Sequence, residues 1–196
     1  KIRSKKRKKL CKCYVFVIFT HMNIQGKLII IGGAVDKGSF TETDLDKNAS
    51  QNLNFFEEGI LKRIINESKN KEQSRIEVIT TASKIPREIG PEYVKAFRYL
   101  GAENVDVLHI ERREQASETE ILDRLKAADV VMFTGGDQLR LTSILGGTPF
   151  DEILISKYRN EDFVYAGTSA GAAAASNSMI YQGSSSEALL KGEVKI

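Results

Sequence analysis

Short apolar runs that end in glycine or small polar residues alternate along this chain with segments of helical periodicity. The apolar runs have the length and composition of strands that are buried on both faces. They occupy residues 28–31, 76–79, 105–110, 130–133 and 163–166. Apolar residues recur at helical spacing between them, for example over 56–65 and 93–100. This alternation predicts an α/β fold, with a mostly parallel sheet and helices on both of its faces.

The charge of the chain is unevenly distributed. Residues 1–26 contain eight of the 29 Lys and Arg residues and none of the 26 Asp and Glu residues. The remaining residues therefore carry 21 basic and 26 acidic side chains, a net charge of −5, which argues against nucleic acid as a partner. With 196 residues and no internal repeat or linker, the sequence predicts a basic and apolar arm over 1–26, outside the fold, and a single α/β domain over 27–196.

The arm combines a basic run with the apolar stretch 13–19, an order that resembles a secretory signal. No small-residue cleavage site follows this stretch, and Met22 stands just before the first strand. We therefore interpret 1–21 as upstream read-through or a leader, with Met22 as the natural start of a cytoplasmic domain. A targeting or membrane-surface segment and a nucleic-acid arm are the alternatives. Cys11 and Cys13 have neither disulfide-framework nor zinc spacing, and we expect no metal site and no membrane association.

The carboxyl ends of the predicted strands are rich in glycine and small residues. In open parallel sheets, ligands bind beyond these ends, and glycine there lets the backbone approach a ligand closely. The ends read Gly32-Gly33-Ala34, Thr80-Thr81-Ala82-Ser83, Gly135-Gly136-Asp137-Gln138 and Gly167-Thr168-Ser169-Ala170-Gly171. We therefore expect a functional site at this end of the sheet.

The last of these ends fits the G-x-S-x-G pattern of a nucleophile elbow, a strand, sharp turn and helix that expose a reactive serine. Ser169 is the candidate nucleophile, and the flanking glycines would make room for its strained backbone. The Ala170 N–H would be one oxyanion donor, and the turn after the fourth strand would supply the second, from Asp137. The alternative is that these small residues merely permit tight packing of helix on sheet, or cradle a phosphate.

Several segments between residues 27 and 196 stand in an order and spacing that is not expected by chance. They are Gly32–Lys37, Phe133–Leu139, Gly167–Ala172, Met179-Ile180 and Ser186–Gly192. With these segments the chain resembles the cyanophycinase family of serine peptidases, which also contains the α-aspartyl dipeptidases such as dipeptidase E. The resemblance implies a fold similar to class I glutamine amidotransferases, which is flavodoxin-like.

The resemblance further implies a serine-type exopeptidase that hydrolyses cyanophycin, a polymer with a polyaspartate backbone and arginines on its side chains, to β-Asp-Arg dipeptides. By matching position, Ser169 would carry the acyl-enzyme, Glu187 would be the acidic triad member, and Gln138 would bind substrate. Alternatively, Glu187 is a solvated carboxylate at a helix start and Gln138 caps its helix. We expect a homodimer that needs no cofactor and acts on cyanophycin or another β-aspartyl peptide.

A serine nucleophile needs a base, and the family supplies a histidine beyond the acidic residue. The two histidines of the sequence are His21, in the arm, and His109, at the end of the third strand. We do not expect His109 to be the base, and we interpret the chain as the N-terminal portion of a cyanophycinase, incomplete at its C-terminus. An α-aspartyl dipeptidase is the alternative enzyme, although Glu187 stands where that enzyme usually has an aspartate. A non-catalytic small-ligand binding module is the alternative from another class, but Gly32-Gly33 lacks the third glycine of a dinucleotide fingerprint.

Overall fold

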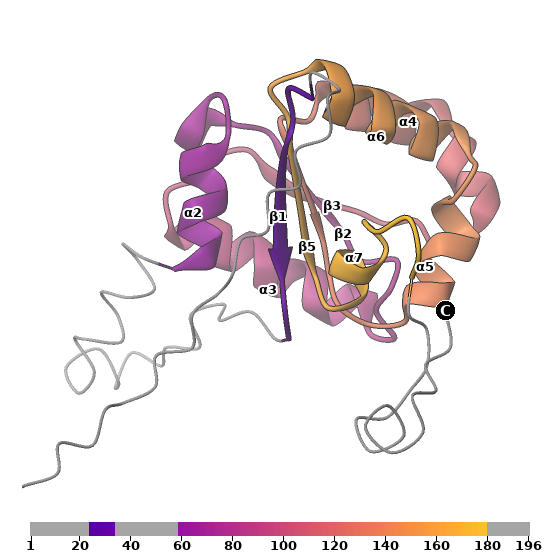
Figure 1. Ribbon diagram of the computed structural model, residues 1–196. Helices are drawn as coiled ribbons and strands as arrows, with labels where there is room; N and C mark the ends of the chain where they lie inside the picture. Colours follow the sequence, from indigo (N-terminus) through magenta and orange to yellow (C-terminus); the bar gives the residue numbers. More distant parts are fainter. Residues whose placement is uncertain (1–23, 34–58, 180–196) are drawn as a thin grey trace, which may run out of the picture.

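The computed structural model describes residues 24–33 and 59–179, which contain one sheet of five parallel strands (Figure 1). The strands are β1 (Lys27–Ile31), β2 (Ile76–Ile79), β3 (Val105–Leu108), β4 (Val130–Phe133) and β5 (Val164–Thr168). Their order across the sheet is β1-β5-β4-β2-β3, and all four pairings are parallel. The predicted α/β class with a mostly parallel sheet is therefore confirmed.

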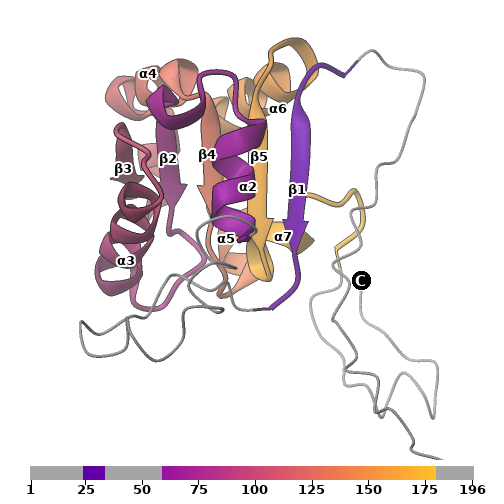
Figure 2. The same ribbon diagram turned by 90° about the vertical axis from the view of Figure 1, so that its left-hand side faces the viewer.

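Helices cover both faces of this sheet (Figure 2). One face carries α2 (Ile60–Glu67) and α3 (Pro86–Tyr99), and the other carries α4 (Thr119–Ala127), α5 (Gln138–Leu145), α6 (Pro149–Asn160) and the short α7 (Ala170–Ala173). Successive strand residues point to opposite faces, so each strand contributes to two cores. In β4, Val130 and Met132 pack with α2 and α3, whereas Val131 and Phe133 pack on the other side. This double burial explains why the strands are continuous apolar runs.

The strand order creates a switch point between β2 and β4. The connection from β2 to β3 runs through α3 on one face, and the connection from β3 to β4 runs through α4 on the other face. Read from the β3 edge, the strand order β3-β2-β4-β5 is the same as the first four positions of the flavodoxin-like order. In that fold, ligands bind beyond the carboxyl ends of the strands at such a switch point. These ends are the segments that the sequence marks as rich in glycine.

Two local features of the structure lie at the ends of helices. Ser117 and Glu120 have the residue types and spacing of a capping box, but Ser117 ends the 3₁₀ helix Arg113–Ser117 and α4 begins at Thr119 without a side-chain cap. 3₁₀ turns are frequent at the N-termini of α-helices, and here one takes the place of the cap. The N–H groups of Gln25 and Gly26 donate to carbonyls at the end of α6 at 3.2 and 2.9 Å, so these two residues contact the domain. The division into an arm over 1–26 and a single domain over 27–196 stays a prediction.

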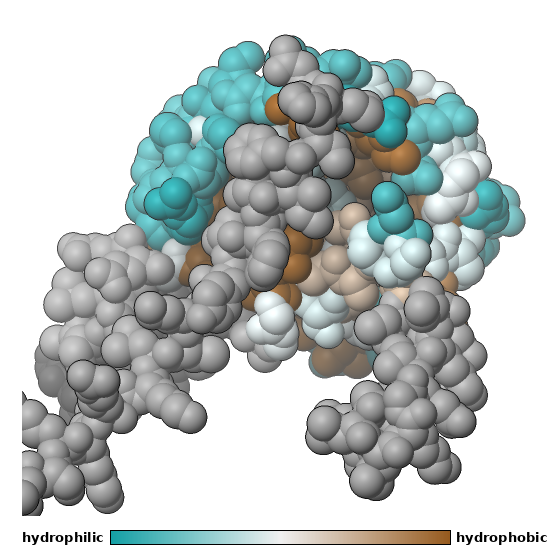
Figure 3. Space-filling model, viewed as in Figure 1, coloured by the Kyte–Doolittle hydropathy of each residue, from teal (hydrophilic) through white to brown (hydrophobic). Residues whose placement is uncertain are grey.

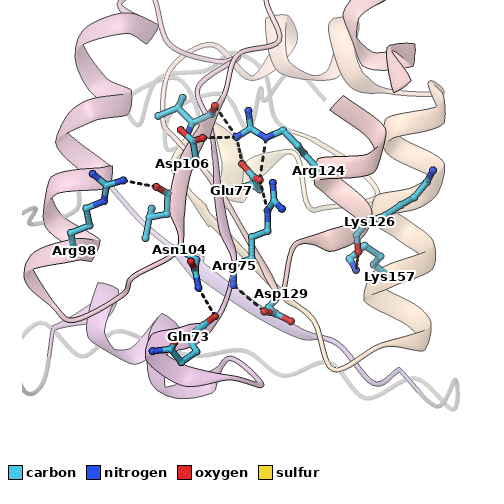
Figure 4. Close-up of polar contacts among 12 residues, drawn as sticks. Gln73, Arg75, Glu77, Arg98, Asn104, Asp106, Arg124, Lys126, Asp129 and Lys157 are labelled. Atoms are coloured by element: carbon cyan, nitrogen blue, oxygen red, sulfur yellow. Dashed lines mark hydrogen bonds and ion pairs between the residues drawn. The ribbon is translucent and has the colours of Figure 1, made fainter. Parts of the chain in front are cut away.

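The β3 edge of the sheet is closed by arginines from both faces (Figure 4). Arg98 donates to the Val105 carbonyl at 3.3 Å, and Arg124 donates to the Val107 carbonyl at 3.1 Å. Arg124 also holds the fully buried carboxylate of Glu77, at 2.5 Å from Oε2 and 3.2 Å from Oε1. These contacts occupy carbonyls that a further strand would need, which is one way in which native sheets protect an edge.

Replacing Arg124 with alanine is expected to lower the free energy of unfolding by about 3 kcal/mol, because it removes two of the three hydrogen bonds that described side chains make to the buried carboxylate of Glu77 and leaves only the bond from Arg75, at 3.0 Å. Arg98→Ala is the matched control, since it removes a cap from the same strand edge and should cost only about 1 kcal/mol. Urea unfolding of both variants gives the comparison. Equal losses would mean that the ion pair with Glu77 is not what stabilises this edge.

At the opposite edge of the described sheet, β1 pairs with β5 alone among the described strands, and four of its five residues, Leu28 to Ile31, are apolar. Ile30 in β1 is 46% exposed, and the view toward this edge shows hydrophobic patches between hydrophilic helical surfaces (Figure 3). This edge therefore contrasts with the arginine-capped edge at β3.

Among the described helices, none is long and apolar enough to span a bilayer.

Candidate active site

Ser169 lies at the sharp turn between β5 and α7 with a strained backbone. Its φ and ψ are 50° and −107°, a region that non-glycine residues rarely adopt and that costs about 1–3 kcal/mol. Its side chain is exposed, and its N–H donates to the Ile31 carbonyl of β1 at 3.0 Å. The strand, turn and helix predicted from the G-x-S-x-G pattern are present. The nucleophilic role of Ser169 stays a prediction.

The glycines on either side of Ser169 permit very close packing. A Cβ on Gly167 would lie 2.4 Å from the Gly171 carbonyl oxygen, and a Cβ on Gly171 would lie 2.5 Å from the Cβ of Phe133. Tight packing of helix on sheet therefore accounts for both glycines. It does not account for a serine with positive φ, and strain of this kind clusters at functional sites.

The turn after β4 runs beside Ser169. A Cβ on Gly135 would lie 3.3 Å from Ser169 Cβ and 3.9 Å from Ser169 Oγ. Along α7, the first helical hydrogen bond is donated by Ala173 to the Ser169 carbonyl, so the Ala170 N–H precedes the helical bonds. The two segments from which oxyanion donors are predicted are thus adjacent to the serine.

Asp137 connects this turn to the end of the neighbouring strand and caps the N-terminus of α5. Its N–H donates to the Ala82 carbonyl after β2 at 2.8 Å, and its Oδ1 accepts from the N–H groups of Leu139 and Arg140 at 2.9 and 3.1 Å. The predicted oxyanion role of Asp137 stays untested, but the bond to Ala82 engages the N–H that this role requires. The preceding N–H, of Gly136, has no hydrogen-bond partner among the described residues.

Gln138 is half-buried and is the first residue of α5, which lies near α7 at the same end of the sheet (Figure 1). Asp137 is the N-cap of α5, so the alternative that Gln138 caps this helix is wrong. The strong preference of helix N-caps for aspartate is the sequence signal that favours Asp137 over Gln138. The substrate-binding role of Gln138 stays a prediction.

The predicted partners of Ser169 are only partly covered by the structure. Glu187 and His21 lie outside the described residues. His109 follows β3, which is three strand positions from β5, so it lies on the order of 14 Å away at the usual strand spacing. That separation exceeds hydrogen-bond reach, in agreement with the expectation that His109 is not the base.

Other parts of the described structure offer no competing centre of chemistry. A hollow of about 770 Å³ lies between α3 and β3, at the far edge of the sheet from β5. In the described ranges, no three His, Cys, Asp or Glu side chains are grouped so that they could hold a metal ion. The strand ends around Ser169 therefore remain the candidate site.

Sequence reasoning missed Tyr165, which lies below the serine turn. In the sequence, Tyr165 fits the pattern of a buried strand as one more residue of the run. In the structure, its hydroxyl donates to the Gly171 carbonyl at 2.7 Å. The available signal is that a buried tyrosine needs a partner for its hydroxyl.

Comparison with known proteins places these features in a family. Residues 49–191 match the sequence pattern of peptidase family S51. A cyanophycinase from Trichormus variabilis is 43% identical over 112 residues, which cover 57% of this chain and 38% of that protein. A cyanophycinase from Geminocystis herdmanii is 37% identical over 112 residues, which cover 57% of this chain and 41% of that protein. The match thus spans about four tenths of each relative.

A solved structure extends the likeness of fold over more of the chain. The crystal structure of a peptidase from an acI-B1 Actinobacterium superposes with a TM-score of 0.60. It covers 81% of this chain and 60% of the other, at 22% sequence identity. At that identity the likeness concerns the fold alone.

Proposed function

The chain belongs to peptidase family S51, and from this membership we propose that it acts as a serine-type exopeptidase that hydrolyses cyanophycin to β-Asp-Arg dipeptides. The observation that carries the proposal is the strained, exposed Ser169 beside the glycine turn after β4. The similarity of the chain to two cyanophycinases supports cyanophycin as the proposed substrate.

In the proposed reaction, Ser169 Oγ attacks the carbonyl of the scissile amide and a base takes its proton. By resemblance, that base is a histidine oriented by Glu187. The negative charge that develops on the carbonyl oxygen is held by the Ala170 N–H and by an N–H of the turn after β4. Of that turn, Gly136 is the better supported donor, because the Asp137 N–H is bonded to Ala82. Water then hydrolyses the serine ester and releases the dipeptide.

The choice of substrate is tested by the products that the full-length protein from its natural source releases. We expect β-Asp-Arg from cyanophycin and slower cleavage of α-aspartyl dipeptides. The opposite preference would make the protein an α-aspartyl dipeptidase, and no turnover of either substrate would contradict the proposed function. We further propose that the protein is a homodimer, which size measurement in solution tests, and that it is cytoplasmic, which fractionation of cells of its natural source tests.

Gln138→Ala is expected to reduce kcat/KM for cyanophycin by about 10- to 100-fold, the effect of losing hydrogen bonds to a charged substrate. Neutral dipeptides, which use these bonds less fully, should be less affected. Gln73→Ala, at an exposed position in the 3₁₀ helix Lys71–Gln73, is the control for a glutamine outside the site. Unchanged kinetics on cyanophycin would remove Gln138 from the substrate site.

A further inference from the structure

A single buried side chain, Tyr165, touches both segments that flank the candidate oxyanion site. It lies in β5, four residues before Ser169, and is 8% exposed. Its hydroxyl donates to the Gly171 carbonyl at 2.7 Å. Its ring stacks on Phe133 of β4, with ring centroids 4.8 Å apart and ring planes inclined by 23°.

The Gly171 carbonyl accepts this bond at a point where α7 stops being an α-helix. The N–H of Ala174 donates to the Ala170 carbonyl at 3.0 Å, as in an α-helix, but the next N–H, of Ala175, donates to the Ala172 carbonyl at 3.3 Å. Among the described residues, no backbone N–H donates to the Gly171 carbonyl. A buried carbonyl needs a partner, and the tyrosine hydroxyl supplies it.

The position of this carbonyl is closely restricted. It sits over Gly167, where a Cβ would approach its oxygen to 2.4 Å, and Gly167 and Tyr165 lie on the same face of β5. The hydrogen bond from the Tyr165 hydroxyl thus holds the first turn of α7 against β5. Because Ala170 immediately precedes Gly171, a contact that fixes the Gly171 carbonyl also restricts where the backbone of Ala170 lies.

The ring of Tyr165 contacts the second segment beside the site, the end of β4. Phe133 is the last residue of β4, and the turn that begins with Thr134 and Gly135 follows it directly. Stacking on Phe133 therefore supports the strand end from which the turn leaves toward Ser169. Burial raises the pKa of the Tyr165 hydroxyl, and the Asp151 carboxylate adds to the shift, so the hydroxyl remains a proton donor at neutral pH.

We propose that Tyr165 is a positioning residue for the reaction: its hydroxyl and ring hold the Ala170 N–H and the turn after β4 in the relative arrangement that stabilises the oxyanion. The strained backbone of Ser169 persists only if its surroundings determine it, and Tyr165 is one of these determinants. The inference rests on the proposed function, since it assigns Tyr165 to the same site.

The test is the rate at which a fluorophosphonate labels Ser169 in the full-length protein and its Tyr165→Phe variant. Phenylalanine keeps the ring and removes only the hydroxyl. We expect labelling to slow by about 10- to 100-fold, the scale that a small misplacement of catalytic groups produces. With cyanophycin, kcat should fall by a similar factor and KM should change little, because the oxyanion forms only in the transition state.

Ser68→Ala is the matched control. The Ser68 hydroxyl is also buried and also donates to a backbone carbonyl, that of Ile65 at 2.6 Å, but it lies at the end of α2. Both variants should lower the thermal midpoint by a few degrees, on the order of 2–6 °C, and only Tyr165→Phe should slow labelling. Rates are compared at a temperature at which circular dichroism shows all three proteins folded.

The outcomes separate this inference from the proposed function. A parent protein that is labelled at Ser169, with Tyr165→Phe labelled at the same rate, overturns the positioning role and leaves the proposed function intact. Equal slowing in Ser68→Ala also overturns it, because the effect would then follow from lost stability alone. A parent protein that is not labelled at Ser169 overturns the proposed function and the inference together.

Discussion

Hydrolysis of cyanophycin by the full-length protein is expected to fall by ~10³-fold or more in the Ser169→Ala variant, the scale observed when a triad member is removed. Stability should hardly change, because the side chain is exposed and alanine keeps the same strained backbone as serine. Steady-state kinetics with the polymer and urea unfolding of the same preparations measure the two quantities. Residual activity near that of the parent would contradict the nucleophilic role.

Two further serine variants sharpen this result. Ser169→Gly should be as inactive as Ser169→Ala but at least as stable, since glycine adopts a φ of 50° without strain. Ser143→Ala removes an exposed hydroxyl that donates to the Arg140 carbonyl within α5, and it should keep full activity. If Ser169→Gly were clearly less stable than Ser169→Ala, the strain at this turn would be smaller than the backbone angles indicate.

Gly136→Ala is expected to lower the free energy of unfolding by about 3 kcal/mol or more, in the range of the most damaging single substitutions. Gly136 has a φ of 145°, and a Cβ there would lie 2.0 Å from the Ala82 carbonyl oxygen. The turn could not keep its bond from Asp137 to Ala82, and the N–H groups beside Ser169 would move. Activity should therefore fall by about 100-fold or more even under conditions in which the variant is folded.

Gly147→Ala is the control for Gly136→Ala, because it introduces the backbone strain of a positive φ without a steric clash of the new Cβ. Gly147 also has a positive φ, 65°, but the nearest atom to a Cβ there is a side-chain nitrogen of Arg113 at 3.9 Å. This variant should lose only about 1–2 kcal/mol, the cost of a left-handed conformation, and should keep its activity. Similar losses in both variants, measured by urea unfolding, would show that the contact with Ala82 is not decisive.

Elements whose cause is local could be predicted from the sequence almost to the residue. Strands β2 and β4 have the bounds of their apolar runs, because burial on both faces requires every residue of the run to be apolar or paired. Helix α6 begins at Pro149 after Thr148, whose side chain accepts a hydrogen bond from the Asp151 N–H, as proline at the first helical position predicts. The G-x-S-x-G pattern likewise predicted the sharp turn at Ser169.

Features that depend on distant residues could not be predicted in the same way. Glu77 interrupts an apolar run. Arg75, two residues earlier, pairs with it locally, but only the fold shows that Arg124, 47 residues later, pairs with it as well. Asp137 matches a motif position, but its N–H is engaged by a carbonyl from a different strand end. The order that places β3 at one edge and β1 at the other follows from pairing between segments far apart in the chain, and it decides that His109 is remote from Ser169.

The sequence by itself therefore determined the α/β class, the strand positions and the turn that carries Ser169, because burial and turn geometry act over a few neighbouring residues. Only the tertiary structure decided which strand ends meet at the switch point, and which atoms hold the serine turn in place. Tyr165 illustrates the reason: its hydrogen bond to Gly171 exists only once a helix has packed on a strand at the distance that two glycines permit. Such a distance is a property of the assembled layers, and no local pattern encodes it.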